Sequence, residues 1–131
     1  MRFLLGLVFF FLSFLGFSAP SGYLYFKKLT TQESQISVGT ASLSGFPVLI
    51  KITDADLKST VNGGRVRSAN GYDIVFTAAD GNTLIPFQTE DYDATTGELV
   101  AWVKLPILSA LVNTEFYVFF GNTATAVNLG T

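Results

Sequence analysis

The sequence contains no cysteine and no histidine, and only 14% of its 131 residues are charged. These absences exclude a disulfide framework, a zinc finger, a thiol nucleophile and a Ser-His-Asp triad. Eight basic against ten acidic residues give a net charge of −2, which argues against a nucleic-acid binder that relies on phosphate neutralisation. The length allows one domain of ordinary size.

Residues 1–18 have the three parts of a secretory signal peptide. Arg2 supplies a positive charge, an apolar run extends from Phe3 to Phe17, and small residues stand at Gly16 and Ser18. The run is shorter than the roughly twenty residues that a helix needs to cross a hydrocarbon core. We therefore predict cleavage after Ser18 and a secreted, periplasmic or cell-surface location. An uncleaved membrane anchor is the alternative.

The rest of the chain alternates between extended segments and turn residues. This pattern predicts roughly six or seven short strands, the first of which is aromatic near its start and polar near its end. The predicted strands with the clearest alternation are Gly22–Thr30, Phe46–Thr53, Tyr72–Ala78, Thr83–Tyr92, Glu98–Leu105 and Glu115–Phe120. A further edge strand is predicted within Gln32–Thr40.

Turn residues separate these strands. Asp54 is predicted to be the N-cap of a single helical turn, and Lys58–Gly71 to be a polar surface loop. The segment Asp80-Gly81-Asn82 is typical of a hairpin, and Pro106 is expected to end the preceding strand.

Together these features predict an all-β fold, an antiparallel β-sandwich of jelly-roll type preceded by the signal peptide. The sandwich is expected over residues 19–122, and residues 123–131 would form a C-terminal tail or truncated linker. Its predicted core consists of Phe46, Val48, Ile50, Ile52, Ile74, Phe76, Leu84, Leu99, Ala101, Val103, Phe116, Val118 and Phe120.

Five motifs in a fixed order carry a family resemblance: GYLYFKK, SGFPVLIKITDADL, NGYDIVFTAADG, YDATTGELVAWVKLP and FYVFFGN. Together they resemble the domain of unknown function 2341 family, from about Gly22 to Asn122. The resemblance implies an extracellular β-sandwich that is one module of a larger secreted or envelope protein. It also implies neighbours such as a downstream laminin-G or concanavalin-like lectin domain, absent from this chain, or a TolQ/ExbB-type proton channel subunit. It supplies no catalytic residues.

Acidic residues gather near one predicted turn. Glu90, Asp91 and Asp93 could supply the oxygen ligands of a structural Ca²⁺, although no D-x-D-x-D-G pattern organises them, and a solvated hairpin end is the alternative. Glu90 and Glu98 could also form a glycosidase carboxylate pair, but such a pair needs a substrate cleft. Asp54 and Asp56 resemble a metal-binding D-x-D, but an N-cap followed by an acid in the first turn explains both residues and is the favoured interpretation.

Two further groups are candidates for ligand binding. Arg65 and Arg67 lie in the long polar loop, where an arginine pair can clamp a carboxylate or sulfate. Tyr92 and Trp102 have flat rings that suit sugars and protein partners, although aromatic pairs also stabilise sheets. Asp73 is expected to accept hydrogen bonds from the polar loop, and a cation site shared with Asp80 is the alternative.

These observations predict a non-catalytic binding or adhesion module that contacts a glycan or an envelope protein. No cofactor is expected except a structural Ca²⁺, and no nucleic acid is expected as a partner. Membrane contact is expected only through an uncleaved N-terminal segment. The alternatives are a periplasmic domain of a TolQ/ExbB-type membrane transport complex and a small glycoside hydrolase that uses Glu90 and Glu98.

Overall fold

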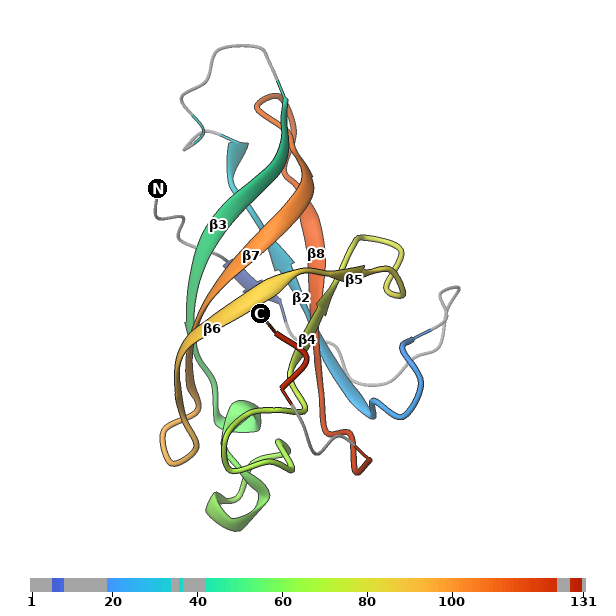
Figure 1. Cartoon of the computed structure of the whole chain (residues 1–131). Coiled ribbons are helices and arrows are strands. Elements are labelled where there is room, and N and C mark those ends of the chain that lie inside the picture. The colour runs from blue at the N-terminus through green and yellow to red at the C-terminus, as the bar shows by residue number, and fades with distance from the viewer. Residues whose placement is uncertain (1–5, 9–18, 34–35, 37–41, 125–127, 131) are drawn as a thin grey trace.

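The computed structural model describes residues 6–8, 19–33, 36, 42–124 and 128–130 (Figure 1). Two single-turn 3-10 helices, η2 (Ala55–Leu57) and η3 (Thr60–Asn62), follow one another between two of the strands. The strands in chain order are β1 (Gly6–Val8), β2 (Tyr25–Thr30), β3 (Leu43–Thr53), β4 (Val75–Thr77), β5 (Leu84–Ile85), β6 (Phe87–Asp93), β7 (Glu98–Leu108) and β8 (Glu115–Phe120).

The strands form two antiparallel sheets. One sheet has the order β1-β2-β8-β4-β5, and the other has the order β3-β7-β6. Figure 1 shows the ribbon of β3, β7 and β6 lying across β2, β8 and β4. The inward side chains of the two sheets meet in one apolar core, because residues on a strand alternate between its two faces. The predicted antiparallel β-sandwich is confirmed.

Strand β7 shows how alternation builds this core. Leu99, Ala101 and Val103 are fully buried, whereas the residues between them are only partly buried. The predicted core is correct apart from Phe46, which packs only partly against it, and Leu84, which is 55% exposed. Its neighbour Ile85 points inward in its place.

Pro86 divides the segment Thr83–Tyr92, whose extended pattern predicts one continuous strand. Residues 84–85 form β5 and pair with β4, whereas β6 begins at Phe87 and pairs with β7 in the other sheet. Proline has no N–H to continue a ladder, and the carbonyl of Pro86 accepts a hydrogen bond from the Lys104 N–H at 2.9 Å. The prediction of one continuous strand over Thr83–Tyr92 is therefore wrong, and so is the inward position predicted for Leu84.

Pro106 lies inside β7 and does not end it. The pairing of β3 with β7 joins Phe46 to Leu105 and then Ser44 to Ile107, so it passes over Pro106. The N–H of Lys104 points toward the β6 side, and Pro106, two residues further on, faces the same way beyond the start of β6. The missing N–H of Pro106 therefore removes no ladder hydrogen bond, and the strand continues to Leu108.

The N-terminal segment contributes one strand to the first sheet. Residues of β1 pair with Lys28–Thr30 at the edge of β2. The other residues of the predicted signal peptide lie outside the described residues, as does most of the edge strand predicted within Gln32–Thr40. Within the part of the chain that is described, no helix is long and apolar enough to span a membrane. Cleavage after Ser18 stays a prediction.

Candidate functional site

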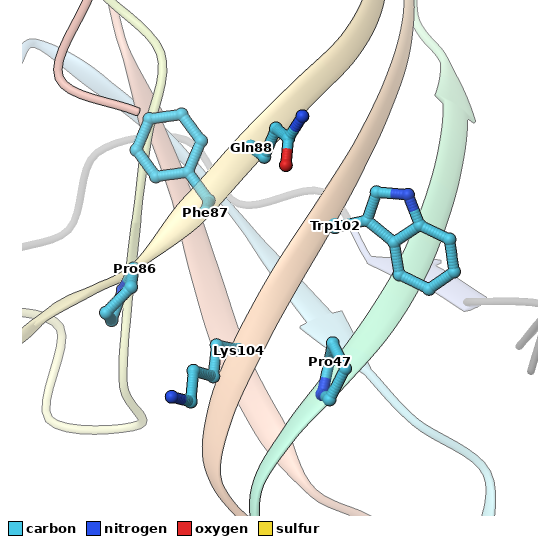
Figure 2. A pocket seen from close by; sticks show the side chains of 6 residues that line it. All are labelled: Pro47, Pro86, Phe87, Gln88, Trp102 and Lys104. Carbon is cyan, nitrogen blue, oxygen red and sulfur yellow. The ribbon is translucent and has the colours of Figure 1, made fainter. Parts of the chain in front are cut away.

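An open hollow of about 160 Å³ lies on the outer face of the three-stranded sheet, beside the single tryptophan of the chain (Figure 2). It combines apolar rings with one amide and one ammonium group. The residues that line it are Pro47, Pro86, Phe87, Gln88, Trp102 and Lys104.

Strand register places Trp102 at the centre of this face. Its neighbours on β7, Ala101 and Val103, are fully buried in the core, so the indole points outward. Trp102 lies opposite Leu49 on β3 and opposite Gln88 on β6. The indole is partly buried between these strands and leaves a ring surface that a ligand can reach.

Lys104 supplies the positive charge at the rim of the hollow. It follows Trp102 by two residues on the same face of β7, and its side chain is exposed. Pro47 lies opposite it on β3. A flat ring, an amide and an ammonium group thus share one solvent-facing surface, which we call the Trp102 face.

Tyr92 does not join the Trp102 face. It lies opposite Leu99, whose side chain is buried in the core. Its hydroxyl donates a hydrogen bond to the carbonyl of Leu57 at 2.7 Å. Burial raises the pKa of the Tyr92 phenol, and the negative charges of Asp73 and Asp93 add to this, so the hydroxyl remains a donor.

Asp73 organises the polar loop that carries the two arginines. Its fully buried carboxylate accepts hydrogen bonds from the N–H groups of Arg67 at 2.7 Å, Ser68 at 2.9 Å and Gly121 at 3.1 Å. These bonds tie the loop to the end of β8. The structural role predicted for Asp73 is confirmed.

The two loop arginines have different surroundings. The guanidinium of Arg65 lies 4.6 Å from the centre of the Tyr25 ring and donates a hydrogen bond to the Tyr25 hydroxyl at 3.1 Å. Its Nε lies 3.6 Å from Oδ1 of Asp56. Arg67, in contrast, is exposed. Arg65 is therefore held by neighbours within the protein, and neither arginine lines the hollow at Trp102.

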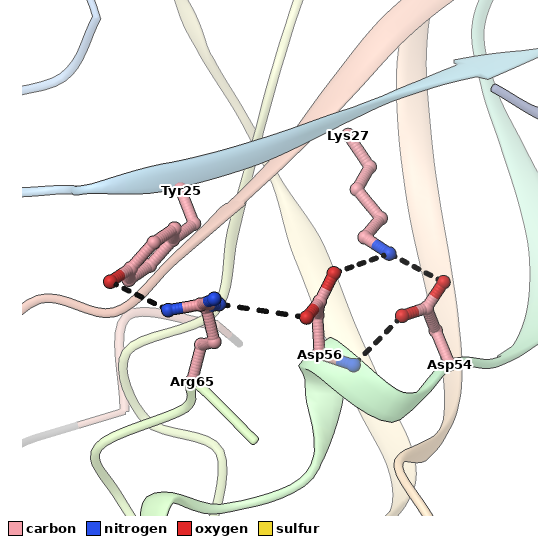
Figure 3. Close-up of polar contacts among 5 residues, drawn as sticks. All are labelled: Tyr25, Lys27, Asp54, Asp56 and Arg65. Atoms are coloured by element: carbon pink, nitrogen blue, oxygen red, sulfur yellow. Dashed lines mark hydrogen bonds and ion pairs between the residues drawn. The ribbon is translucent and has the colours of Figure 1, made fainter. Parts of the chain in front are cut away.

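A buried charge cluster, which sequence reasoning missed, connects β2 to η2 (Figure 3). The Nζ atom of Lys27 lies 2.5 Å from Oδ2 of Asp54 and 3.1 Å from Oδ2 of Asp56. The side chains of Lys27 and Asp54 are each only 3% exposed. Asp54 also caps η2 as predicted, because its Oδ1 accepts the N–H of Asp56 at 2.8 Å.

The predicted calcium ligands lie along one strand. Glu90, Asp91 and Asp93 all belong to β6, and a bulge between Thr89 and Asp91 interrupts its pairing. Asp93 accepts the N–H groups of Thr95 and Thr96, and these hydrogen bonds lower the pKa of its carboxyl. Across the described ranges, no group of three or more acidic side chains is placed to hold a metal ion.

Glu98, the other residue of the glycosidase alternative, lies at the start of β7. Its carboxylate forms an ion pair with Lys51 at 3.1 Å on the outer face of the sheet. It is not among the residues that line the hollow at Trp102.

Comparison with known families gives a match in the C-terminal half of the chain. Residues 70–129 match the profile of a family described as a domain of unknown function, DUF2341. Over these residues the chain is similar to that family, in agreement with the resemblance carried by the sequence motifs. The DUF2341 match includes Trp102, Lys104 and Asp73, whereas Lys27 and Asp54 precede it. No curated protein and no solved structure matches the chain.

Proposed function

We propose that the protein is a secreted or cell-envelope β-sandwich module that binds a polysaccharide without cleaving it. The observation that carries this proposal is the outward indole of Trp102 beside an open hollow on the three-stranded sheet. A large amphipathic ring on a rigid strand offers contact area with little loss of conformational entropy on binding.

The other groups of the Trp102 face suit a carbohydrate. The apolar face of a sugar ring packs against an indole, and the Gln88 amide can both donate to and accept from sugar hydroxyls. The Lys104 ammonium would pair with a carboxylate of an acidic sugar. A polysaccharide that contains uronic acids therefore fits this surface better than a neutral one.

The tryptophan itself provides the test, because Trp102 is the only one in the chain. Titration with a soluble polyuronate should change the position or intensity of its fluorescence, and a neutral glucan should give a weaker response. Calorimetry on Trp102→Ala should show binding weakened by about 30-fold or more, the effect of losing roughly 2 kcal/mol. Lys104→Ala should reduce the preference for the polyuronate.

Val61→Ala is the matched control, since Val61 is 88% exposed on η3 and does not line the hollow. This variant should bind like the unaltered chain. Equal binding by Trp102→Ala would contradict the proposal, as would the absence of any response to either polysaccharide. In that case contact with an envelope protein, including a TolQ/ExbB-type complex, becomes the function to test.

A further inference from the structure

The buried charge cluster has the composition and geometry of a reactive site. Lys27 extends from β2 of the five-stranded sheet, and Asp54 follows the last residue of β3 in the other sheet. Their side chains meet at an Nζ–Oδ2 distance of 2.5 Å, with Oδ2 of Asp56 3.1 Å from the same nitrogen (Figure 3). A lysine, a carboxyl acceptor and a second carboxylate are the groups required to form an amide between side chains.

We propose that Lys27 and Asp54 join through an intramolecular isopeptide bond, with the Asp56 carboxylate as the proton carrier. Nζ of Lys27 becomes an amide nitrogen bonded to Cγ of Asp54. The product links the two sheets of the sandwich covalently. This inference does not depend on the proposed polysaccharide binding.

The reaction balances without an oxidant or an activating co-reactant. The Asp56 carboxylate takes one proton from the Lys27 ammonium, and the freed lone pair on Nζ attacks Cγ of Asp54. The N–C bond forms, and the bond between Cγ and one carboxyl oxygen then breaks. That oxygen leaves as water with two of the three ammonium protons, both carried by Asp56. One proton stays on the amide nitrogen, and Asp56 is regenerated.

Burial favours this step. The Lys27 and Asp54 side chains are each 3% exposed, so an ion pair between them lacks the hydration that would stabilise it in water. Loss of hydration reduces the cost of moving a proton from ammonium to carboxylate. Exclusion of solvent also protects the amide product from hydrolysis, and fixed positions remove the entropic barrier of bringing the groups together.

The backbone of η2 stabilises the charge that develops during attack. The N–H of Asp56 donates to Oδ1 of Asp54 at 2.8 Å. Attack on Cγ places negative charge on this carboxyl group, where an aligned N–H donor acts as an oxyanion hole. Arg65, with its Nε 3.6 Å from Oδ1 of Asp56, fixes the carboxylate whose other oxygen faces Lys27.

Two exposed pairs in the same chain lack this arrangement and serve as internal references. Lys51 lies 3.1 Å from Glu98, and Lys28 lies 2.9 Å from Glu115. Their side chains are between 27% and 64% exposed, so water solvates both charges. We expect these pairs to remain ionic although their distances resemble those of the buried cluster.

Mass spectrometry of the denatured full chain tests the proposal directly. The intact mass should be lower by one water molecule than the mass calculated for the polypeptide present. Digestion should release a branched peptide that joins the segment around Lys27 to the segment around Asp54. Lys27→Arg keeps a positive charge but lacks the nucleophilic amine, so this variant should show the full mass and no branched peptide.

The Lys27 and Asp56 variants distinguish isopeptide formation from other reactions that release water. Asp80-Gly81 can lose water by backbone succinimide formation, which Lys27→Arg would leave intact. A water loss that persists in Lys27→Arg, or a full mass in the unaltered chain, overturns the proposal. Asp56→Asn should restore the full mass while the dichroism spectrum remains that of a β protein. An isopeptide bond that still forms at the same rate in Asp56→Asn overturns the role of Asp56.

Discussion

Two lysine–carboxylate sites of this protein have similar contact distances and very different surroundings. Lys27 lies 2.5 Å from Asp54 with both side chains 3% exposed, whereas Lys51 lies 3.1 Å from Glu98 with the side chains 64% and 32% exposed. The first site joins the two sheets, and the second joins neighbouring strands of one sheet.

The comparison shows that burial, more than distance, decides what an ion pair does. On the surface, water solvates each partner separately, so the pair adds little to stability. In the interior, removing one partner leaves the other charge without hydration or compensation. An ammonium and a carboxylate therefore add little to the stability of the fold at the exposed site. At the buried site, each charge depends on the other for its compensation.

The largest expected effect comes from Lys27→Met, which removes the positive charge from the buried site. Asp54 would be left as a buried carboxylate, and we expect the free energy of unfolding to fall by about 3–5 kcal/mol. Urea denaturation at neutral pH measures this change. Lys27→Arg, which keeps the charge, should lose less, and a loss below about 1 kcal/mol in Lys27→Met would remove the contrast between the two sites.

A pair of glycines tests how tightly the chain is packed around the buried site. Gly97 has a φ of 76°, and a Cβ there would lie 2.0 Å from the carbonyl oxygen of Asp54. Gly63 has a φ of 86° with no atom within 4 Å of such a Cβ. Both substitutions to alanine carry the cost of positive φ, so Gly97→Ala should lose about 1–3 kcal/mol more than Gly63→Ala.

Thermal unfolding of the two variants gives the comparison directly. Equal losses would show that the contact between the β6–β7 turn and Asp54 relaxes easily, and that the buried site tolerates movement of its backbone.

An effect of intermediate size is expected at Asp93, an exposed carboxylate that accepts hydrogen bonds from the backbone. Those bonds lower its pKa in the folded protein, so it stabilises the fold above the unfolded value of about 3.9. This contribution disappears as the pH falls through the lower folded value. Asp93→Asn should therefore lose less stability than the unaltered chain between neutral pH and about pH 3.

Thermal melts across that pH range measure the effect, with Glu90→Gln on the same strand as a charge-matched control. An unchanged acid dependence in Asp93→Asn would mean that the turn hydrogen bonds do not distinguish the two charge states of the carboxyl.

The smallest effect is expected from Lys51→Ala. Breaking this exposed pair should change the free energy of unfolding by no more than about 1 kcal/mol, and added salt should shrink the difference. Urea denaturation at low and high ionic strength provides the measurement. A loss comparable to that of Lys27→Met would show that exposure does not separate the two sites.

The sequence was sufficient to predict the sandwich and most of its core, because alternation reports which side chains face inward. It also placed the N-cap at Asp54, since capping depends on neighbours in the chain. It did not locate the change of sheet at Pro86, because the residues on either side have the same extended pattern. Only the pairing partners, β4 and β7, distinguish them.

The buried charge cluster could not be predicted for a related reason. Lys27 stands near the polar end of its strand in the sequence, where a solvated lysine is the ordinary expectation. Its burial depends on Asp54 and Asp56, which follow strand β3 of the other sheet as the cap and first turn of η2. Trp102 was recognisable as a binding candidate from the sequence. Its neighbours at the hollow could not be predicted, because they come from three different strands that only the sheet pairing brings together.

Pro86 connects the Trp102 face to the five-stranded sheet, so a ligand bound at this face should affect both sheets. It lines the hollow at Trp102 and is also the single residue at which the backbone passes from β5 to β6. A ligand that contacts the Pro86 ring would therefore contact the residue that connects the two sheets. Occupancy should therefore slow amide hydrogen exchange in β5 as well as in β6, although β5 contributes no residue to the hollow.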